Sequence, residues 1–592
     1  MAIISLPYNV AVAAAGAYSL TRYAPEYTHL VSANPYTIFS ILYSLILAWK
    51  IVYHVFLYPK WLSPLNKLPK PPAGGSWYNG FFWECFGTGT GEMETMWTTQ
   101  VPHQGFLYYL HIFNSQRVIV ASPSAVQELC VRADDFTKPR LIRLLAQRFL
   151  GMGLVLAETE QHRAQRRVFL PIFAPRHVRE MYPIFWAKTR EVTQKLVGII
   201  ESSGAEGRSN ERVAVLEVGH WSSRAALDIV TMATLGKDFG SVENEHSLLA
   251  KSYRNALEPT RGHLVQAMFK LFFPSWIVDN MPNRWNRALA EYVPIFRGTC
   301  RDLLIEKRKA ASDETIKTKG KDLLSLCFQY EESARADEEE LIDQLTTFLA
   351  AGHETISVGI TWAVYMMCLH PEWQRLLREE ARAHFPDPTA RDASHDTAPD
   401  PFDVEKLPML QAFIHEVLRW YPPIPETMRE PLRDTVVAGQ FLPKGLTLVV
   451  PIKGIMRQET CFGPDAAVFN PRRWLTEKPV DMEGSSTGTG TGTGGATKLA
   501  FNSTGGATSK YANLSFMQGV RSCIAMNFAK AEMACIIAAW VGRFSFELED
   551  PSLMDEKNMK ISNGSFSGRP ANGLNVKWGV VDGWGPKKAV EA

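Results

Sequence analysis

The sequence lacks the paired cysteines of a disulfide framework or a zinc site. None of its eight cysteines forms a CxxC pair; they are Cys85, Cys130, Cys300, Cys327, Cys368, Cys461, Cys523 and Cys535. This pattern excludes a zinc ribbon and indicates a reducing, cytosol-facing environment. The sequence also lacks an excess of positive charge: its net charge of +2 argues against a nucleic-acid-binding protein.

Long strand patterns and internal repeats are missing as well. The 592 residues are 46% hydrophobic and 21% charged, which is a globular composition. Apolar residues recur with helical spacing through most of residues 120–430, and the clearest strand patterns are residues 118–120 and 446–450. We therefore expect a mainly α protein with a small β part.

Residues 36–58 form the one long apolar run, with Lys50 as its single charged residue. As a helix this run is about 35 Å long, enough to cross a bilayer. Lysines follow this run, and no acidic residue lies between residue 58 and Glu84. The positive-inside rule therefore places that side in the cytoplasm. A buried core helix is the alternative. Residues 1–35 lack the basic start of a signal peptide and predict a lumenal tail or a weak second membrane segment.

Proline and glycine cluster in residues 68–77, which cannot continue a helix and predict a stiff hinge. We divide the chain into an N-terminal segment 1–35, a transmembrane anchor 36–58, a hinge 59–80 and a globular domain 81–592. Residues 484–510, mostly Gly, Thr and Ser, predict a flexible insertion. They contain a GxGxxG match without the flanking strand and helix that a dinucleotide site requires.

The most informative run is residues 516–525, F-M-Q-G-V-R-S-C-I-A, directly before a helical pattern. A thiolate at a helix N-terminus is stabilised by free N–H groups and the helix dipole. Cys523 in this position suits a haem iron, where an axial thiolate favours O–O cleavage. Gly519 allows the tight turn, Arg521 suits a haem propionate, and Phe516 would pack beside the sulfur. A buried free cysteine is the alternative.

Residues 337–370 predict a helix of about 50 Å that begins in acidic residues. Its middle reads A-G-H-E-T, in which Ala351 and Gly352 would let a flat cofactor approach. Thr355 can bond back to a carbonyl and open the helix locally. Glu354 and Thr355 form an acid–alcohol pair that can deliver protons to bound oxygen, so both are candidate catalytic residues. A glycine-containing core helix is the alternative.

These runs resemble the haem loop and the oxygen-activating helix of the cytochrome P450 family. The resemblance extends to an E-x-x-R pair, Glu416 and Arg419, and to the arginine of a P-x-R-F/W run, Arg473. It implies that these three form a structural triad. Ala525 departs from the more frequent Gly, and Ile356 from Thr or Ser. The implied fold is the cytochrome P450 fold plus an N-terminal transmembrane helix, and residues 81–592 would be the haem-thiolate catalytic domain.

The resemblance also implies a haem b cofactor, with Cys523 as the metal ligand and cations on its propionates. Arg429 matches a second propionate-binding position of the family, beside Arg521. In H-R-A-Q-R-R, residues 162–167, His162 replaces the usual Trp and Arg166 keeps the arginine; a histidine can still donate to a propionate. A solvated basic helix face is the alternative for this run.

The implied reaction is R–H + O2 + two electrons + two protons → R–OH + H2O. The chain ends too soon after the haem loop for flavin or NADPH domains, so we expect a separate NADPH–cytochrome P450 reductase, with cytochrome b5 as a second candidate donor. The resemblance implies a single-pass protein of the endoplasmic reticulum membrane with its catalytic domain on the cytoplasmic side. Four basic residues could receive an acidic partner: Arg163, Arg167, Lys510 and Lys530.

The substrate is expected to be a lipophilic small molecule, such as a terpenoid, polyketide or alkaloid intermediate of secondary metabolism. A fatty-acid hydroxylase of the same family is the alternative. A reductase-independent haem-thiolate isomerase or dehydratase is a further alternative, against which Thr355 argues, and a non-enzymatic haem-binding protein is another. Ile424, Glu426 and Thr427 match a family region that faces substrate. The apolar residues 271–278 could line an entrance, touch the membrane or belong to the core.

Overall fold

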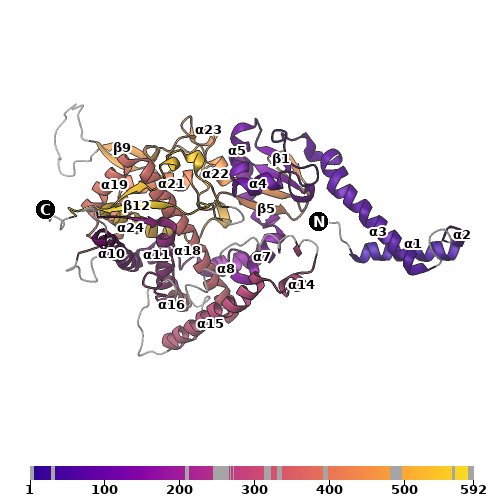
Figure 1. The fold of residues 1–592 in the computed structure, drawn as a ribbon, viewed down its shortest axis with the longest axis horizontal. Coiled ribbons are helices and arrows are strands. Elements are labelled where there is room, and N and C mark those ends of the chain that lie inside the picture. Colours follow the sequence, from indigo (N-terminus) through magenta and orange to yellow (C-terminus); the bar gives the residue numbers. More distant parts are fainter. Residues whose placement is uncertain are drawn as a thin grey trace, which may run out of the picture.

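The helix α18, Glu338–Leu369, runs through the middle of a mainly helical body (Figure 1). Its 32 residues correspond to about 48 Å. Asp337 caps the N-terminus by accepting from the Glu339 N–H, and three glutamates occupy the first turn, where negative charge is stabilised. The computed structural model describes residues 6–28, 34–206, 212–244, 266, 269–270, 273–312, 322–329, 337–390, 398–479, 497–562 and 567–584.

The main hydrophobic core forms where other long helices cover α18. The helix α11, Val218–Leu235, lies along it, and α10, Tyr182–Glu206, packs between α11 and α24, Met526–Arg543. The helices α19, Pro371–His384, and α21, Pro408–Trp420, complete this core, whereas α15, Arg284–Ser312, covers its outer edge. Almost every residue of α24 is buried, so the helix that follows the Cys523 loop is held on all sides.

A five-stranded sheet at one end of the body joins segments that are far apart in the sequence. Its order is β1 (Phe106–Leu110), β2 (Gln116–Val120), β8 (Thr447–Val450), β5 (Thr427–Pro431) and β3 (Phe136–Thr137). The two predicted strand patterns are neighbours, since β2 and β8 pair in parallel with Val118 opposite Leu448. A second sheet has the order β11 (Phe544–Leu548), β12 (Asn575–Val580) and β4 (Val213–Glu217). The predicted fold class is confirmed.

Short elements connect these layers. The helices are α4 (Phe82–Thr88), α5 (Glu92–Gln100), α6 (Pro123–Val131), α7 (Arg140–Leu150), α8 (Thr159–Phe169), α9 (Pro175–Glu180), α14 (Ser275–Asp279), α16 (Leu323–Gln329), α20 (Pro401–Lys406), α22 (Ile452–Ile455), α23 (Glu459–Phe462) and the 3-10 helix η7 (Pro471–Trp474). The strands are β6 (Thr435–Val437), β7 (Gln440–Leu442), β9 (Leu475–Pro479) and β10 (Thr497–Phe501). Of the apolar residues 271–278, Phe273, Trp276 and Ile277 are exposed.

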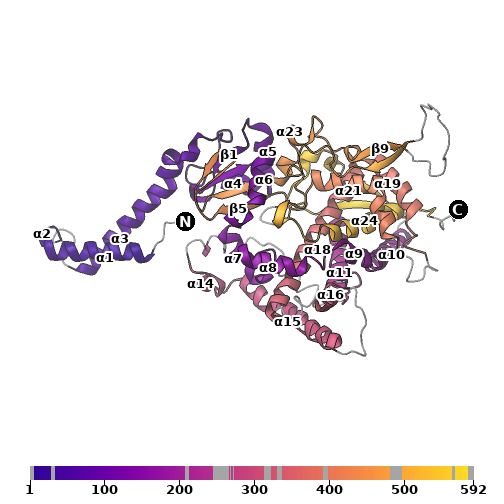
Figure 2. The ribbon, with the colours of Figure 1, turned by 180° about the vertical axis from the view of Figure 1, so that it is seen from behind.

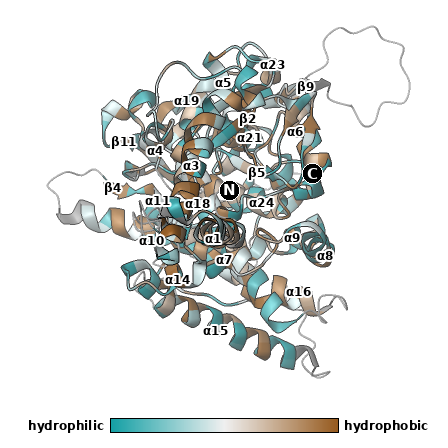
Figure 3. Cartoon of the chain, turned by 90° about the vertical axis from the view of Figure 1, so that its right-hand side faces the viewer, coloured by the Kyte–Doolittle hydropathy of each residue, from teal (hydrophilic) through white to brown (hydrophobic). Residues whose placement is uncertain are grey.

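The N-terminal helices extend away from the body (Figure 2). They are α1 (Leu6–Tyr23), the short α2 (Pro25–Thr28) and α3 (Pro35–Ile51), which continues as the π-helix η2 (Val52–Leu62). Among the described residues, the helix Pro35–Lys67 is long and apolar enough to cross a membrane, and α3 is largely hydrophobic in Figure 3. This helix contains the predicted anchor, residues 36–58.

The end of this helix is fixed to the body where the sequence predicts a hinge. The helix continues through Pro59 to Leu62, so it does not end at residue 58. Tyr108 Oη donates to the Pro59 carbonyl over 2.8 Å, and Asn114 Nδ2 donates to the Val55 carbonyl over 2.9 Å. The proline run therefore follows a docked helix end, because side chains of the β1–β2 hairpin satisfy carbonyls that the proline leaves without helical partners.

The predicted flexible insertion, residues 484–510, is only partly within the described structure. Residues 480–496 lie outside the described residues. Residues 497–501 instead form β10, which pairs with β9, and Phe501 lies 4.6 Å from the His415 ring. The prediction is wrong for residues 497–510, because a few apolar side chains within a Gly/Thr/Ser-rich composition suffice to pack against α21.

Candidate active site

A hydrogen bond and a tight glycine turn define the backbone of the loop that carries Cys523. The Cys523 N–H donates to the Phe516 carbonyl over 2.8 Å and closes the loop. Gly519 has a φ of +74°, and a Cβ there would lie 2.9 Å from the Cys130 carbonyl oxygen of α6. Only glycine combines this backbone conformation with such a close approach. The turn thus delivers Cys523 to the N-terminus of α24.

The Cys523 side chain is accessible to solvent, and neighbouring residues surround its sulfur closely enough to affect its pKa. Burial raises the pKa of Cys523, while the Ala525 N–H and the Arg166 guanidinium act in the opposite direction. Arg166 donates to the Ser522 carbonyl over 2.7 Å and to Ser522 Oγ over 3.1 Å. Arg166 was predicted to bind a propionate; here it holds the loop and places a positive charge beside the thiol.

A group of buried cations surrounds Arg521 of this loop. Arg521 donates to the Ala157 carbonyl over 2.7 Å and pairs with Glu158. Burial lowers the pKa of Lys138 to about 7, with Arg429 acting in the same direction. Burial, followed by Arg521, lowers the pKa of His162 to about 3. The structure therefore brings together Arg521, Arg429 and His162, as predicted, and adds Lys138.

This cluster fits the propionates of a haem. Glu158 is the one carboxylate that acts strongly on Lys138, whereas Arg429, Arg521 and Arg143 all lower its pKa. The buried Nε of Arg143 has no hydrogen-bond partner among the described residues. Uncompensated buried cations are costly, so a dianionic group at this place would relieve them. Cys523, as an accessible thiol beside the cluster, would supply the matching metal ligand.

The middle of α18 bears the predicted acid–alcohol pair. Thr355 Oγ1 donates to the Ala351 carbonyl over 2.8 Å, while the helix stays continuous. Glu354 Oε1 accepts a hydrogen bond of 2.5 Å from Ser567 Oγ, so the carboxylate is held by a side chain from the C-terminal part of the chain. Ala351 is exposed and residues 352–355 are half-buried, whereas residues 356–367 of the same helix are buried. The helix therefore presents Ala351, Glu354 and Thr355 on an accessible stretch.

Gly352 has a different role from the predicted one. A Cβ at Gly352 would lie 2.8 Å from Cγ2 of Val230 on α11. The missing side chain thus lets α11 approach α18, and it does not face a cofactor. The neighbouring His353 lies 2.7 Å from Ser223 Oγ on α11, and burial lowers its pKa to about 4. These contacts fix the rotation of α18 and so the direction of Thr355.

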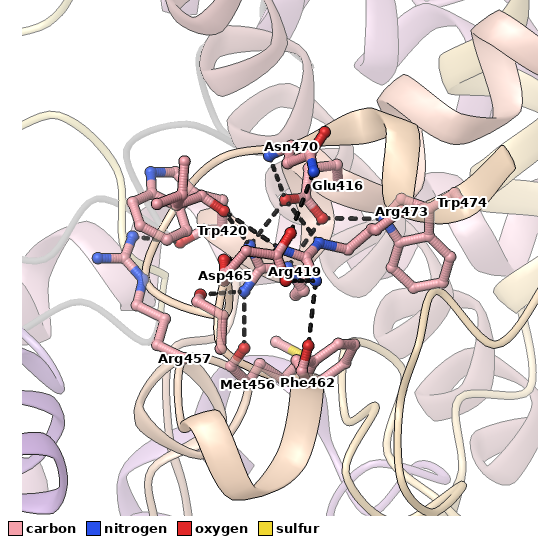
Figure 4. A network of polar contacts seen from close by, with 12 residues as sticks. Glu416, Arg419, Trp420, Met456, Arg457, Phe462, Asp465, Asn470, Arg473 and Trp474 are labelled. Atoms are coloured by element: carbon pink, nitrogen blue, oxygen red, sulfur yellow. Dashed lines mark hydrogen bonds and ion pairs between the residues drawn. The ribbon is translucent and has the colours of Figure 1, made fainter.

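Glu416 is the centre of a buried polar network (Figure 4). Arg419 donates to Glu416 Oε2 through Nε over 2.8 Å and to Oε1 through Nη2 over 2.7 Å. Arg473 Nε lies 3.2 Å from Oε1, and both Glu416 and Arg419 are fully buried. The predicted triad therefore meets in space.

Two further donors complete the shell of Glu416. The Asn470 N–H donates to Oε1 over 2.7 Å, and Trp474 Nε1 donates to Oε2 over 2.9 Å. Arg419 also donates to the carbonyls of Met456 and Ala466 over 2.7 and 2.8 Å. A buried charge pair is stable only when its remaining polar atoms are satisfied, and this network meets that condition.

A cavity of about 430 Å³ lies on the surface beside the Cys523 loop. Phe516, Gln518, Asn527 and Lys530 line it from the loop and from α24, and α21 forms another wall. Lys530 Nζ lies 5.4 Å from the centre of the Phe516 ring, and burial lowers its pKa to about 8. This cavity gives a partner access to the outer side of the loop.

Comparison with known proteins decides the family. Residues 72–569 match the family model described as Cytochrome P450. The chain belongs to the cytochrome P450 family. It is similar to the cytochrome P450 monooxygenase buaD of Petromyces alliaceus, with 47% identity over 551 residues, 92% of each chain. The cytochrome P450 monooxygenase FUM15 of Gibberella moniliformis is 33% identical over 555 residues, 90% of this chain and 91% of that protein. The predicted family and enzyme class, a cytochrome P450 monooxygenase, are confirmed.

Several residues of this cytochrome P450 site were not predicted. Lys138, Glu158 and Ser567 contact predicted site residues, but they lie in short segments without a recognisable spacing. Trp474 had a usable signal, since it directly follows Arg473 in the P-R-R-W run. Long-range pairing, such as that of Ser567 with Glu354, becomes visible only in the folded chain.

Replacing Ser567 with alanine should impair proton delivery without removing haem. The Glu354 carboxylate would lose a short hydrogen bond, so we expect peroxide released per NADPH consumed to rise about tenfold, the size of one charge-assisted bond. Ser562→Ala is the matched control, because among the described residues its hydroxyl donates a long hydrogen bond of 3.5 Å to the Ser567 carbonyl and none to Glu354. Unchanged coupling in Ser567→Ala would show that Ser567 does not position Glu354.

Glu416→Gln should destabilise the protein more than Trp474→Phe. The first change leaves Arg419 and Arg473 buried with too little negative charge, which costs about 3–5 kcal/mol. The second removes one hydrogen bond to a charged acceptor, about 1.5–3 kcal/mol. Urea unfolding followed by circular dichroism gives both free energies. A smaller loss for Glu416→Gln than for Trp474→Phe would contradict the central place of the carboxylate.

Proposed function

We propose that this cytochrome P450 monooxygenase hydroxylates a lipophilic intermediate of secondary metabolism, a terpenoid, polyketide or alkaloid. The observation that supports it most is the combination of an accessible Cys523, a buried cation cluster and a Glu354–Thr355 pair on α18. Similarity to monooxygenases from fungi supports the substrate class. A fatty-acid hydroxylase of the same family is the alternative, and no contact among the described residues favours it.

The residues of the site divide the work. Haem b, bound through the Cys523 thiolate, would supply the activation of dioxygen. Burial raises the pKa of Cys523, and the Ala525 N–H and Arg166 act against that rise, in the direction of the thiolate form that ligates metal. Arg429, Arg521, Lys138 and His162 would hold the propionates. The network around Glu416 keeps a structural role.

Proton supply would depend on α18. Glu354, oriented by Ser567, can hold a proton close to the accessible stretch of the helix. Thr355 has its hydroxyl directed to the Ala351 carbonyl, so its oxygen remains free to accept from water or from Glu354. An acid and an alcohol in sequence can pass protons inward, which the reaction requires twice for each product formed.

The electron donor would be an NADPH–cytochrome P450 reductase, with cytochrome b5 as a second candidate. The cavity beside Phe516 and Lys530 supports docking next to the Cys523 loop. Arg163 is less suited than predicted, because it already pairs with Glu160 over 2.6 Å and Asp134 over 3.3 Å. The apolar helix Pro35–Lys67 supports attachment to the endoplasmic reticulum membrane, with the body in the cytoplasm.

Reconstitution with a reductase tests this function. A panel of terpenoids, polyketides, alkaloids and fatty acids is first screened for a ligand-induced change of the haem spin state. Hits are then incubated with NADPH and ¹⁸O-labelled dioxygen. We expect one labelled oxygen atom in the product, only when reductase is present, and only with secondary-metabolite ligands. Turnover of fatty acids alone would favour the alternative, and product formation without reductase would contradict a monooxygenase.

A further inference from the structure

The helix α1 lies antiparallel along α3 in a fixed register (Figure 2). Lys50 Nζ near the end of α3 donates to Asn9 Oδ1 near the start of α1 over 2.6 Å. Farther along, a Cβ at Gly16 would lie 3.1 Å from Cδ1 of Leu42. The start of α1 is therefore level with the end of α3, and the two helices cover the same depth.

One face of α1 is closed by α3. Asn9, Ala13 and Ala17, one helical turn apart, are 2%, 1% and 4% exposed, although the hairpin stands apart from the body. Val10 and Val12 on another face are 39% and 43% exposed. Small residues at the contact let helix backbones approach closely, as in membrane helix pairs.

The polar contact explains how α3 tolerates a charge. Lys50 is the single charged residue of residues 36–58, and a charge within a membrane span needs a partner. Asn9 offers its side-chain carbonyl and is itself buried against α3, whereas the lysine is half-buried. The partner of the one cation in the span thus comes from α1.

We propose that α1 and α3 enter the bilayer together as a helical hairpin, which places the N-terminus on the same side as the catalytic body. The 18 residues of α1 are about 27 Å long, close to the thickness of a hydrocarbon core. The charges of Arg22 and Glu26 at the turn between the helices cancel. Three lysines follow the hairpin on the side of the body, which the positive-inside rule places in the cytoplasm. The sequence predicts a single-pass anchor and leaves residues 1–35 as a lumenal tail or a weak second membrane segment; the proposed hairpin corresponds to the second of these.

This inference rests on the proposed membrane attachment, and glycosylation mapping separates the two. An Asn-Gly-Thr acceptor with flexible spacers is inserted either before Ile3 or after Thr28 of the full chain, which is expressed in microsomes. We expect the acceptor after Thr28 to be glycosylated and the acceptor before Ile3 to remain unmodified. The native sequons Asn502-Ser503-Thr504, Asn513-Leu514-Ser515 and Asn563-Gly564-Ser565 would be modified only in a lumenal body and should stay unmodified.

Each other pattern has a definite meaning. Glycosylation at both acceptors would overturn the hairpin and restore a single span, because residues 1–35 would then lie in the lumen. An unmodified acceptor after Thr28 in a chain that resists alkaline extraction would also overturn it, since α1 would then not cross. Release of the chain by alkaline extraction would instead reject the membrane attachment itself.

Variants of the contact test its cause. Ala13→Leu with Ala17→Leu would push α1 away from α3, and we expect glycosylation of the acceptor before Ile3 to rise several-fold, because α1 would then stay in the lumen. Val10→Leu with Val12→Leu is the matched control, since these side chains are exposed and the change in apolar volume is in the same direction. Equal glycosylation in both pairs would show that packing against α3 does not carry α1 across.

Discussion

In this cytochrome P450, the packing of α21, residues 470–474 and the Cys523 loop depends on the Glu416 carboxylate. Its two oxygens accept from Arg419, Arg473, the Asn470 N–H and the Trp474 indole. Two segments, α21 and residues 470–474, are therefore held in an arrangement in which the buried charges of this network are paired. The arrangement continues to the Cys523 loop, because Ser515 Oγ donates to the Leu418 carbonyl of α21 over 3.1 Å. Breaking this carboxylate should loosen the loop that holds the thiol.

The cation cluster sets a second condition. Lys138, Arg429 and Arg521 lie close together around Glu158, and burial works against their charge. A protein with such a cluster gains stability when an anionic group binds, because binding free energy adds to folding free energy. These residues would therefore suit the anionic propionates of a haem, with Cys523 as its metal ligand. Arg166 donates a hydrogen bond to the carbonyl of Ser522, the residue before Cys523.

Much of the fold and site could be predicted because the motifs are local or have fixed spacing. The 516–525 run, the α18 sequence and the E-x-x-R pair each describe backbone geometry within a few turns. Contacts between distant segments could not be predicted, such as Gly352 against Val230. A missing side chain looks the same in the sequence whether a helix or a cofactor fills the space.

Composition leaves long-range contacts out of view in two places. The proline run predicts a hinge, and the helix end before it is tied by Tyr108 and Asn114, which lie far along the chain. The Gly/Thr/Ser-rich residues predicted flexibility through residue 510, yet Phe501 packs on His415. In both cases a few long-range contacts outweigh the local preference of many residues. The Arg166 contact has the same origin, since its partner Ser522 lies in another part of the sequence.

The central claim is that Cys523 is the thiolate ligand of a haem held by this framework. The most direct measurement is the carbon monoxide difference spectrum of the reduced protein, for the native chain and for Cys523→Ser. The account predicts the thiolate-type band in the native protein and its loss in the variant, because a serine hydroxyl is a poor anionic ligand. Cys461→Ser, at a buried cysteine away from the loop, should keep the band. A thiolate-type band that persists in Cys523→Ser would contradict the assignment.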